Sequence, residues 1–139
     1  MDDAFRFREE IPLRLRDLDQ MNHVNNAVYA TFLEQTRSAY FREVVGAPLE
    51  EIGAVIADLA IEFEQAITLD AGHVTVGARA TDLGDSSVPL VYEVWADGER
   101  AATGETTLVY VDRTSGEVRS LPDSWRAAIT DFEEFDDRT

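Results

Sequence analysis

Side chains able to do chemistry gather in one short stretch of the sequence, residues 17–29, which reads DLDQMNHVNNAVY. It contains two aspartates, three asparagines and one of the chain's two histidines. A carboxylate in such a stretch can act as a nucleophile or as the base that activates water. Backbone N–H groups at the start of a following helix can hold the oxyanion that attack on a carbonyl creates. The composition of this stretch therefore indicates chemistry at a carbonyl group.

Each of these side chains also has a structural interpretation, and on the residues alone both interpretations stay open. Asn25 or Asn26 can simply cap the helix that follows. His23 can be a hydrogen-bonded structural histidine, and Asp17 can be an acid at a strand end or turn. Because the chain has two histidines and no cysteine, no metal site is expected, and it contains no glycine-rich phosphate loop.

The stretch lies where a strand is expected to meet a long helix. Apolar residues alternate from Ile11 to Leu15, which is typical of a half-buried strand. Asp17 and Asp19 continue the inward phase of that strand, and we expect partial burial of Asp19, which would raise its basicity. From 27 to 45 the apolar residues recur at helical spacing, and Gly46 follows as a stop signal.

The remainder of the chain is expected to form four strands and a short helix. Alternating patterns predict strands at 59–64, 74–81, 88–95 and 101–111, the last two joined by an Asp97-Gly98 turn. Pro122 begins the short helix, and 133–139 are predicted to be an acidic, frayed tail. Strands that follow one another after a long helix favour one α+β domain over 1–139, with a five-stranded antiparallel sheet curled around the helix.

The net charge of the chain excludes some classes of binding partner. Twelve basic residues, all arginine, stand against 28 acidic ones, which gives a net charge of −16 at pH 7. Such a charge repels nucleic acids and anionic membranes, and no apolar run approaches the roughly 18 residues of a membrane span, so we expect a cytoplasmic protein. Concentrated salt would screen this self-repulsion, which favours a halophilic host; a GC-rich genome would explain the missing lysines but not the acids.

The run DLDQMNHVNNAVY, with Glu34 and Arg37 in the helix after it, resembles the signature of hot-dog-fold acyl-CoA thioesterases of the 4-hydroxybenzoyl-CoA thioesterase type. It is also similar to the DLD…HVNN segment of plant acyl-ACP thioesterases. The resemblance extends over nearly the whole chain, because the family shares this strand order and a small residue like Gly104 in the last strand. It implies the hot-dog fold, in which the sheet wraps around the long helix.

The resemblance also implies that the chain hydrolyses an acyl thioester. By position, the family's catalytic acid falls on Asp19, which would attack the carbonyl or activate water while N–H groups at the helix start hold the oxyanion. His23, Asn25 and Asn26 match the HVNN element and would orient the thioester and the water. Some bacterial relatives have a histidine at the position of Asn26, and a glycine is common at the position of Asn22.

In this family the acyl group lies in a channel beside the helix, and pantetheine enters along a subunit interface. We expect the channel wall to be formed by five apolar residues: Tyr29, Phe32, Leu33, Leu59 and Phe63. The charge of −16 disfavours docking of an acidic acyl-carrier protein, so CoA is the expected carrier, and no cofactor is expected. Another branch of the family uses a helical glutamate, but Glu34 with Arg37 at i, i+3 is interpreted as a surface or interface ion pair.

Two other functions stay open. A hot-dog dehydratase or hydratase would share the fold but pairs an aspartate with a histidine in a different helix-start motif. A non-catalytic acyl-binding or oligomerising hot-dog protein would keep the fold without the chemistry. A sheet of this kind leaves two edge strands unpaired, so we expect a homodimer or homotetramer with the thioester between subunits.

Overall fold

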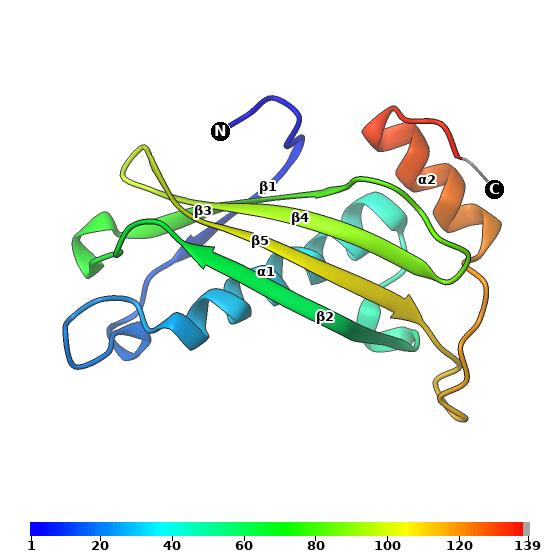
Figure 1. The fold of residues 1–139 in the computed structure, drawn as a ribbon, viewed down its shortest axis with the longest axis horizontal. Helices are drawn as coiled ribbons and strands as arrows, with labels where there is room; N and C mark the ends of the chain where they lie inside the picture. Colours follow the sequence, from blue (N-terminus) through cyan, green and yellow to red (C-terminus); the bar gives the residue numbers. More distant parts are fainter. Residues whose placement is uncertain (138–139) are drawn as a thin grey trace.

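Five antiparallel strands form one sheet in this computed structural model, which describes residues 1–137. They are β1 (Phe7–Pro12), β2 (Ala54–Phe63), β3 (His73–Ala80), β4 (Ser87–Ala96) and β5 (Glu99–Tyr110). Their order is β1-β3-β4-β5-β2, so β1 and β2 are the two edges (Figure 1). The four consecutive strands predicted after the long helix are confirmed. Asp97 and Gly98 both have positive φ in the turn between β4 and β5, as expected for an Asp-Gly hairpin.

Helix α1 (Asn26–Tyr40) lies against one face of the sheet and runs behind the strands in Figure 1. Its buried side chains face the apolar residues of β3, β4 and β5. Gly104 of β5 permits this close packing, because a Cβ at that position would lie 2.7 Å from Leu33 Cδ1. The predicted hot-dog arrangement of a sheet wrapped around a long helix is therefore confirmed.

The end of the long helix differs in detail from the prediction. Regular α-helix stops at Tyr40, and the chain continues as a π-helical turn over Phe41–Val45. Gly46 then adopts a left-handed conformation with φ of 76° and ends the helical segment, as its position after the last apolar residue indicated.

The first strand is earlier in the chain than the alternation from Ile11 to Leu15 predicted. β1 pairs with β3 from Phe7 to Pro12, and residues Leu15–Asp17 form a 3-10 turn instead of strand. Leu15 is 76% exposed, so its expected inward direction is wrong. Because the strand ends at Pro12, which has no N–H to donate, its inward phase does not extend to Asp19.

Edge strand β2 is the most exposed strand of the sheet. Most of its residues are exposed on both faces, and large apolar side chains are among them: Val55, Ile56, Leu59 and Phe63. Leu59, Ile61 and Phe63 pair with Thr106, Gly104 and Ala102 of β5, which are buried on the face toward α1. The helix therefore leaves much of the inner face of β2 uncovered.

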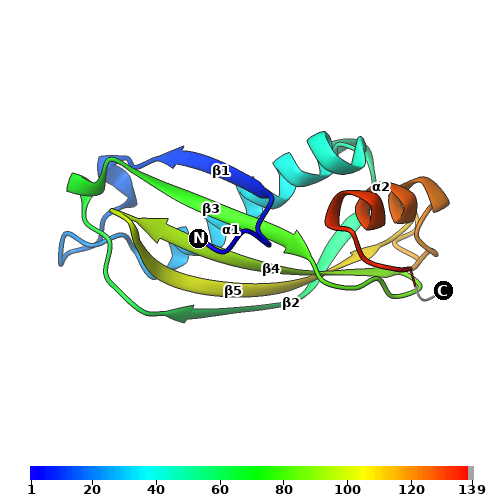
Figure 2. The same ribbon diagram turned by 90° about the horizontal axis from the view of Figure 1, so that it is seen from above.

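A second helix, α2 (Asp123–Glu133), follows Pro122 and buries Trp125 and Ile129. It lies at one end of the sheet, whereas the loop that precedes α1 lies at the opposite end (Figures 1 and 2). Within the described chain, neither α1 nor α2 combines the length and the apolar character that a membrane crossing requires.

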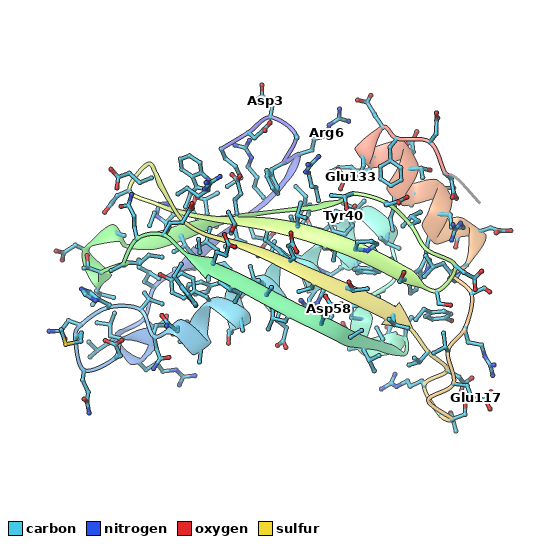
Figure 3. All side chains as sticks on the ribbon, viewed as in Figure 1. Asp3, Arg6, Tyr40, Asp58, Glu117 and Glu133 are labelled. Atoms are coloured by element: carbon cyan, nitrogen blue, oxygen red, sulfur yellow. The ribbon has the colours of Figure 1, made fainter. Side chains whose placement is uncertain are left out.

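Glu133 belongs to α2 and not to the tail that was predicted for 133–139. Its Oε2 accepts hydrogen bonds from the Tyr40 hydroxyl and the Ala80 N–H, each at 2.8 Å, and Figure 3 shows Glu133 and Tyr40 close together. Two ion pairs hold the next residues: Arg6 with Glu134 and Arg126 with Asp137. The residues up to 137 are therefore tied to the body of the protein, and 138–139 lie outside the described residues.

Candidate active site

Asp19 lies in a tight loop between the 3-10 turn and α1. Its N–H donates to the carbonyl of His23 at 2.8 Å, and its Oδ1 accepts from the N–H groups of Met21 at 2.8 Å and His23 at 3.3 Å. Asn22 completes the loop with φ of 59°, a left-handed conformation that glycine adopts freely and asparagine tolerates. This conformation explains how asparagine can stand where relatives commonly have glycine.

The expectation that Asp19 is partly buried is wrong, because its side chain is exposed in this chain. The buried acid is Asp17, which is 2% exposed. Asp17 accepts a hydrogen bond from the Arg14 N–H at 2.8 Å and forms an ion pair with the Arg14 guanidinium at 3.2 Å. The contacts of Asp17 are those of an acid that stabilises a turn. In Asp19, by contrast, Oδ2 has no hydrogen bond among residues 1–137.

The start of α1 leaves one backbone donor free. Asn25 is the N-cap: its side chain accepts from the Ala27 N–H at 2.9 Å, and its carbonyl accepts from the Val28 N–H at 2.8 Å. Asn26 follows as the first helical residue, and its N–H has no acceptor in the described part of the chain. A free N–H at this position adds to the partial positive charge of the helix terminus.

A pocket of about 270 Å³ brings five of the predicted site residues together: Asp19, His23, Asn26, Tyr29 and Phe63. Val24 and residues 64–66 complete its lining. The pocket is therefore formed by the Asp19 loop, the start of α1 and the end of β2, which Figure 1 shows at the same end of the molecule.

Contacts between α1 and β2 shape the apolar side of this pocket. The rings of Tyr29 and Phe63 pack edge to face with their centroids 4.9 Å apart. Burial raises the pKa of the Tyr29 hydroxyl, which keeps it neutral near pH 7. Backbone pairing fixes the same region, since the Val24 N–H donates to the Ile67 carbonyl at 2.8 Å and His23 pairs with Thr68.

Three predicted channel residues do not line the pocket. Phe32 and Leu33 are almost completely buried in the core between α1 and the sheet. Leu59 lies on the uncovered inner face of β2, four residues before Phe63. Asn25 is also outside the lining, because its side chain is engaged in the helix cap.

The residues that follow Phe63 were not predicted from the sequence. Glu64, Gln65 and Ala66 line the pocket, and the Tyr29 hydroxyl donates to the Gln65 carbonyl at 3.5 Å. Arg100 donates two hydrogen bonds to Glu64, at 2.7 and 2.9 Å, and thereby holds the pKa of that carboxyl below its ordinary value. The available signal in the sequence was their position directly after Phe63, which was itself predicted to line the channel.

The interpretation of Glu34 and Arg37 as an ion pair is wrong. Glu34 is exposed, whereas Arg37 is buried and donates from Nη1 to the Tyr92 hydroxyl at 3.4 Å. No salt bridge joins the two residues within 1–137. Helical spacing brings such residues near each other, but packing of α1 on the sheet turns Arg37 inward.

Known proteins resemble this chain over most of its length. Residues 13–129 match the model of a family described as the thioesterase-like superfamily. A curated relative, the uncharacterized protein YsmA of Bacillus subtilis (strain 168), is 23% identical over 128 residues, which cover 91% of this chain and 86% of that protein.

Two solved structures show the same arrangement at higher identity. A thioesterase from Thermus thermophilus, in complex with coenzyme A and zinc, is 35% identical with a TM-score of 0.88, and the match covers 97% of this chain and 99% of that one. A putative thioesterase from Pseudomonas aeruginosa is 31% identical with a TM-score of 0.79, covering 88% and 97%. In the present chain, residues 1–137 contain no group of three histidine, aspartate or glutamate side chains placed to hold a metal ion.

Proposed function

The chain belongs to the thioesterase-like superfamily and is a thioester hydrolase, and we propose that it hydrolyses acyl-CoA thioesters in the pocket that contains Asp19. The resemblance to hot-dog thioesterases that the DLDQMNHVNN run predicted is confirmed by the family match. The observation that carries the proposal is the joint presence of Asp19 and Asn26 in one pocket, because that pocket then contains a carboxylate and the first residue of a helix whose N–H is free. A thioester carbonyl placed between them would meet both groups that its hydrolysis needs.

The proposed reaction uses the two groups at different atoms of the thioester. The Asn26 N–H donates to the carbonyl oxygen and stabilises the negative charge that develops there. Asp19 either attacks the carbonyl carbon, giving an anhydride that water opens, or removes a proton from the water that attacks. In both cases the C–S bond breaks, the thiolate of CoA takes a proton, and the products are a carboxylic acid and free CoA.

The other residues of the HVNN element receive different roles in this proposal. His23 lines the pocket, and its backbone N–H donates to the Asp19 carboxylate. We assign this backbone group to orienting the carboxylate and the imidazole to orienting the bound thioester. Asn25 holds the first turn of α1 through its cap and thereby positions the Asn26 N–H. Tyr29 and Phe63 form the apolar wall next to the reacting carbonyl.

CoA is the proposed carrier of the acyl group. The Thermus thermophilus thioesterase with 35% identity was solved with coenzyme A, which supports this choice. The net charge of −16 still disfavours the docking of an acidic acyl-carrier protein.

We further propose that β2 pairs with β2 of a second copy across a two-fold axis. The strand is an unpaired edge with exposed apolar side chains such as Val55 and Leu59, and an edge of this kind is stabilised by continuing the sheet. Such a dimer would also bring a second copy close to Phe63, at the rim of the pocket. A homotetramer would be formed by two of these dimers.

Assay of CoA release from a panel of acyl-CoAs tests the proposal against its two alternatives. Free thiol should accumulate with the wild-type protein and fall strongly in the Asp19→Asn variant. Tight binding of acyl-CoA without thiol release would favour a non-catalytic acyl-binding protein. Conversion of an enoyl-CoA to a hydroxyacyl-CoA without thiol release would favour a hydratase.

A further inference from the structure

Arg37 of α1 is a buried cation without an anionic partner. Arg37 is 7% exposed. Within residues 1–137 its guanidinium makes one hydrogen bond, the 3.4 Å contact from Nη1 to the Tyr92 hydroxyl. Removing a guanidinium from water without a compensating anion costs free energy, so such groups are ordinarily paired. The absence of a carboxylate within 4 Å in the described chain indicates that a partner comes from outside it.

The neighbours of Arg37 do not supply the missing negative charge. Tyr92 shares its hydroxyl hydrogen bond with Thr106 at 2.7 Å. Burial raises the pKa of Tyr92, and Arg37 together with the hydrogen bonds of that hydroxyl lowers it only in part, so the phenol stays neutral near pH 7. Arg37, Tyr92 and Thr106 therefore form a polar cluster with an uncompensated positive charge.

Arg37 of this cluster and Asn26 of the active-site pocket lie on the same side of α1. Asn26, Ala30, Leu33 and Arg37 are spaced i, i+4, i+7 and i+11, so they follow one flank of the helix. Asn26 lines the pocket at one end, and Arg37 lies about 16 Å further along the helix. Leu33 packs toward Gly104 of β5 and Arg37 contacts Tyr92 of β4, so this flank faces β4 and β5.

The inner face of β2 runs from the pocket toward the same polar cluster. Phe63 and Leu59 remain 46% and 49% exposed on that face, because α1 covers it only in part. Leu59 pairs in register with Thr106, so the strand leads from the pocket to the polar cluster over about 13 Å. Between the pocket and Thr106 the side chains at alternate positions of β2 are apolar: Phe63, Ile61 and Leu59.

Access to the guanidinium is not sealed by the protein. Among the described residues, Arg79 Nε is the one completely buried side-chain nitrogen or oxygen without a hydrogen bond. The nitrogens of Arg37 that lack a partner therefore keep some exposed surface. A guanidinium with two unpaired N–H groups can bind a planar carboxylate at two points.

We propose that Arg37 binds a carboxylate at the far end of the acyl group, so that the preferred substrates are CoA monothioesters of dicarboxylic acids. This inference rests on the proposed function, since it assigns the substrate class of the same site. The apolar middle of the acyl chain lies along Phe63 and Leu59, and the distal carboxylate neutralises Arg37. The thioester carbonyl then lies between Asp19 and Asn26.

The test compares CoA thioesters of straight-chain dicarboxylic acids with monocarboxylic thioesters of the same carbon number, over a series of lengths. For at least one length, wild-type kcat/KM should favour the dicarboxylic thioester by about tenfold or more. Arg37→Gln should remove this preference while retaining hydrolysis of the monocarboxylic series, and Arg37→Lys should restore part of it. No preference at any length, or the same preference in Arg37→Gln, would overturn the proposal.

Two further measurements distinguish substrate binding by Arg37 from a role at the subunit interface and from a failure of the proposed hydrolysis. In the rival explanation, the Glu34 carboxylate of a second copy pairs with Arg37. Glu34→Gln and Arg37→Gln should then both weaken the dimer in sedimentation and leave the ratio of kcat/KM for dicarboxylic and monocarboxylic thioesters unchanged. That result would overturn the proposal. Binding of the two thioester series to the Asp19→Asn variant is measured by calorimetry. A binding preference for dicarboxylic thioesters without any hydrolysis by wild-type protein would contradict the proposed function and retain the role of Arg37.

Discussion

Asp19 and His23 are joined by two hydrogen bonds that close the loop before α1. The Asp19 N–H donates to the His23 carbonyl at 2.8 Å, and the His23 N–H donates to Oδ1 of Asp19 at 3.3 Å. The loop therefore orients the carboxylate largely through backbone groups and leaves Oδ2 free of hydrogen bonds within residues 1–137. An amide at this position could keep the accepted hydrogen bonds and would lose only the ionisable oxygen.

Asp17 should be needed for stability and not for turnover. Asp17→Ala removes the acceptor of the Arg14 N–H and of its guanidinium in a buried position, which should lower the free energy of unfolding by about 1–3 kcal/mol. Denaturant unfolding measures this loss, and kcat is measured where the variant is fully folded. A large loss of kcat without loss of stability would assign Asp17 to the chemistry.

The contrast between Asp17 and Asp19 shows what the sequence could not predict. The DLDQMNHVNN run correctly placed a candidate site at the junction with the long helix. Which of the two aspartates is buried depended on where β1 leaves the sheet, and that is fixed by pairing with β3, some sixty residues later. Local alternation placed both aspartates in the inward phase, and it continued past Pro12 into a 3-10 turn, so the pattern alone could not separate buried Asp17 from exposed Asp19.

The predicted wall of the acyl channel agrees only in part with the contacts in the structure. Tyr29 and Phe63, which were grouped in that wall, pack against each other in the pocket. Phe32 and Leu33 have the same apolar character, but the sheet covers them completely. The burial of Arg37 could not be predicted from the local sequence either, because its contact with Tyr92 joins residues 55 positions apart.

Glu133 should give the folded protein a dependence on pH. Burial is the main cause that raises its pKa above 4.5, although the Ala80 N–H and the Tyr40 hydroxyl lower it in part. A raised pKa in the folded state means that stability from this group is fully present below its unfolded pKa and is lost as the pH rises through the folded value. Wild-type protein should therefore gain stability relative to Glu133→Gln as the pH falls from 8 toward about 4.5.

The matched variant for this prediction is Glu133→Ala. It leaves the Tyr40 hydroxyl and the Ala80 N–H without their acceptor and should cost about 1–3 kcal/mol, whereas glutamine can still accept both hydrogen bonds. Thermal unfolding of all three proteins at several pH values provides the comparison. A difference between wild type and Glu133→Gln that stays constant with pH would contradict this role of Glu133.

Salt should stabilise the protein. With a net charge of −16, repulsion among acidic side chains weakens the fold in dilute buffer, and molar salt reduces the screening length to about 3 Å. The unfolding temperature should rise steadily from low to molar sodium chloride, and mild acid should help at low salt. An unfolding temperature that does not change over this range would support codon bias as the source of the composition.

The proposed dimer can be tested at the exposed edge of the sheet. Val55→Glu places a charge on β2 in both copies, so it should shift the sedimenting species from about twice the chain mass toward 15.5 kDa and reduce turnover with it. Val118→Glu is the control, because Val118 is also exposed but lies outside the sheet strands. A wild-type protein that is active as a species of 15.5 kDa would contradict the shared interface.

We propose that the Asp19 carboxylate performs the hydrolysis. The turnover of the Asp19→Asn variant tests this role most directly. CoA release is followed with a thiol reagent, using the acyl-CoA that wild-type protein hydrolyses fastest, and Asp70→Asn makes the same change at an exposed position outside the pocket. We expect Asp19→Asn to lose about a hundredfold or more in kcat with an unchanged unfolding temperature, and Asp70→Asn to retain wild-type turnover. Wild-type turnover in Asp19→Asn would show that the carboxylate is structural and that the proposed mechanism is wrong.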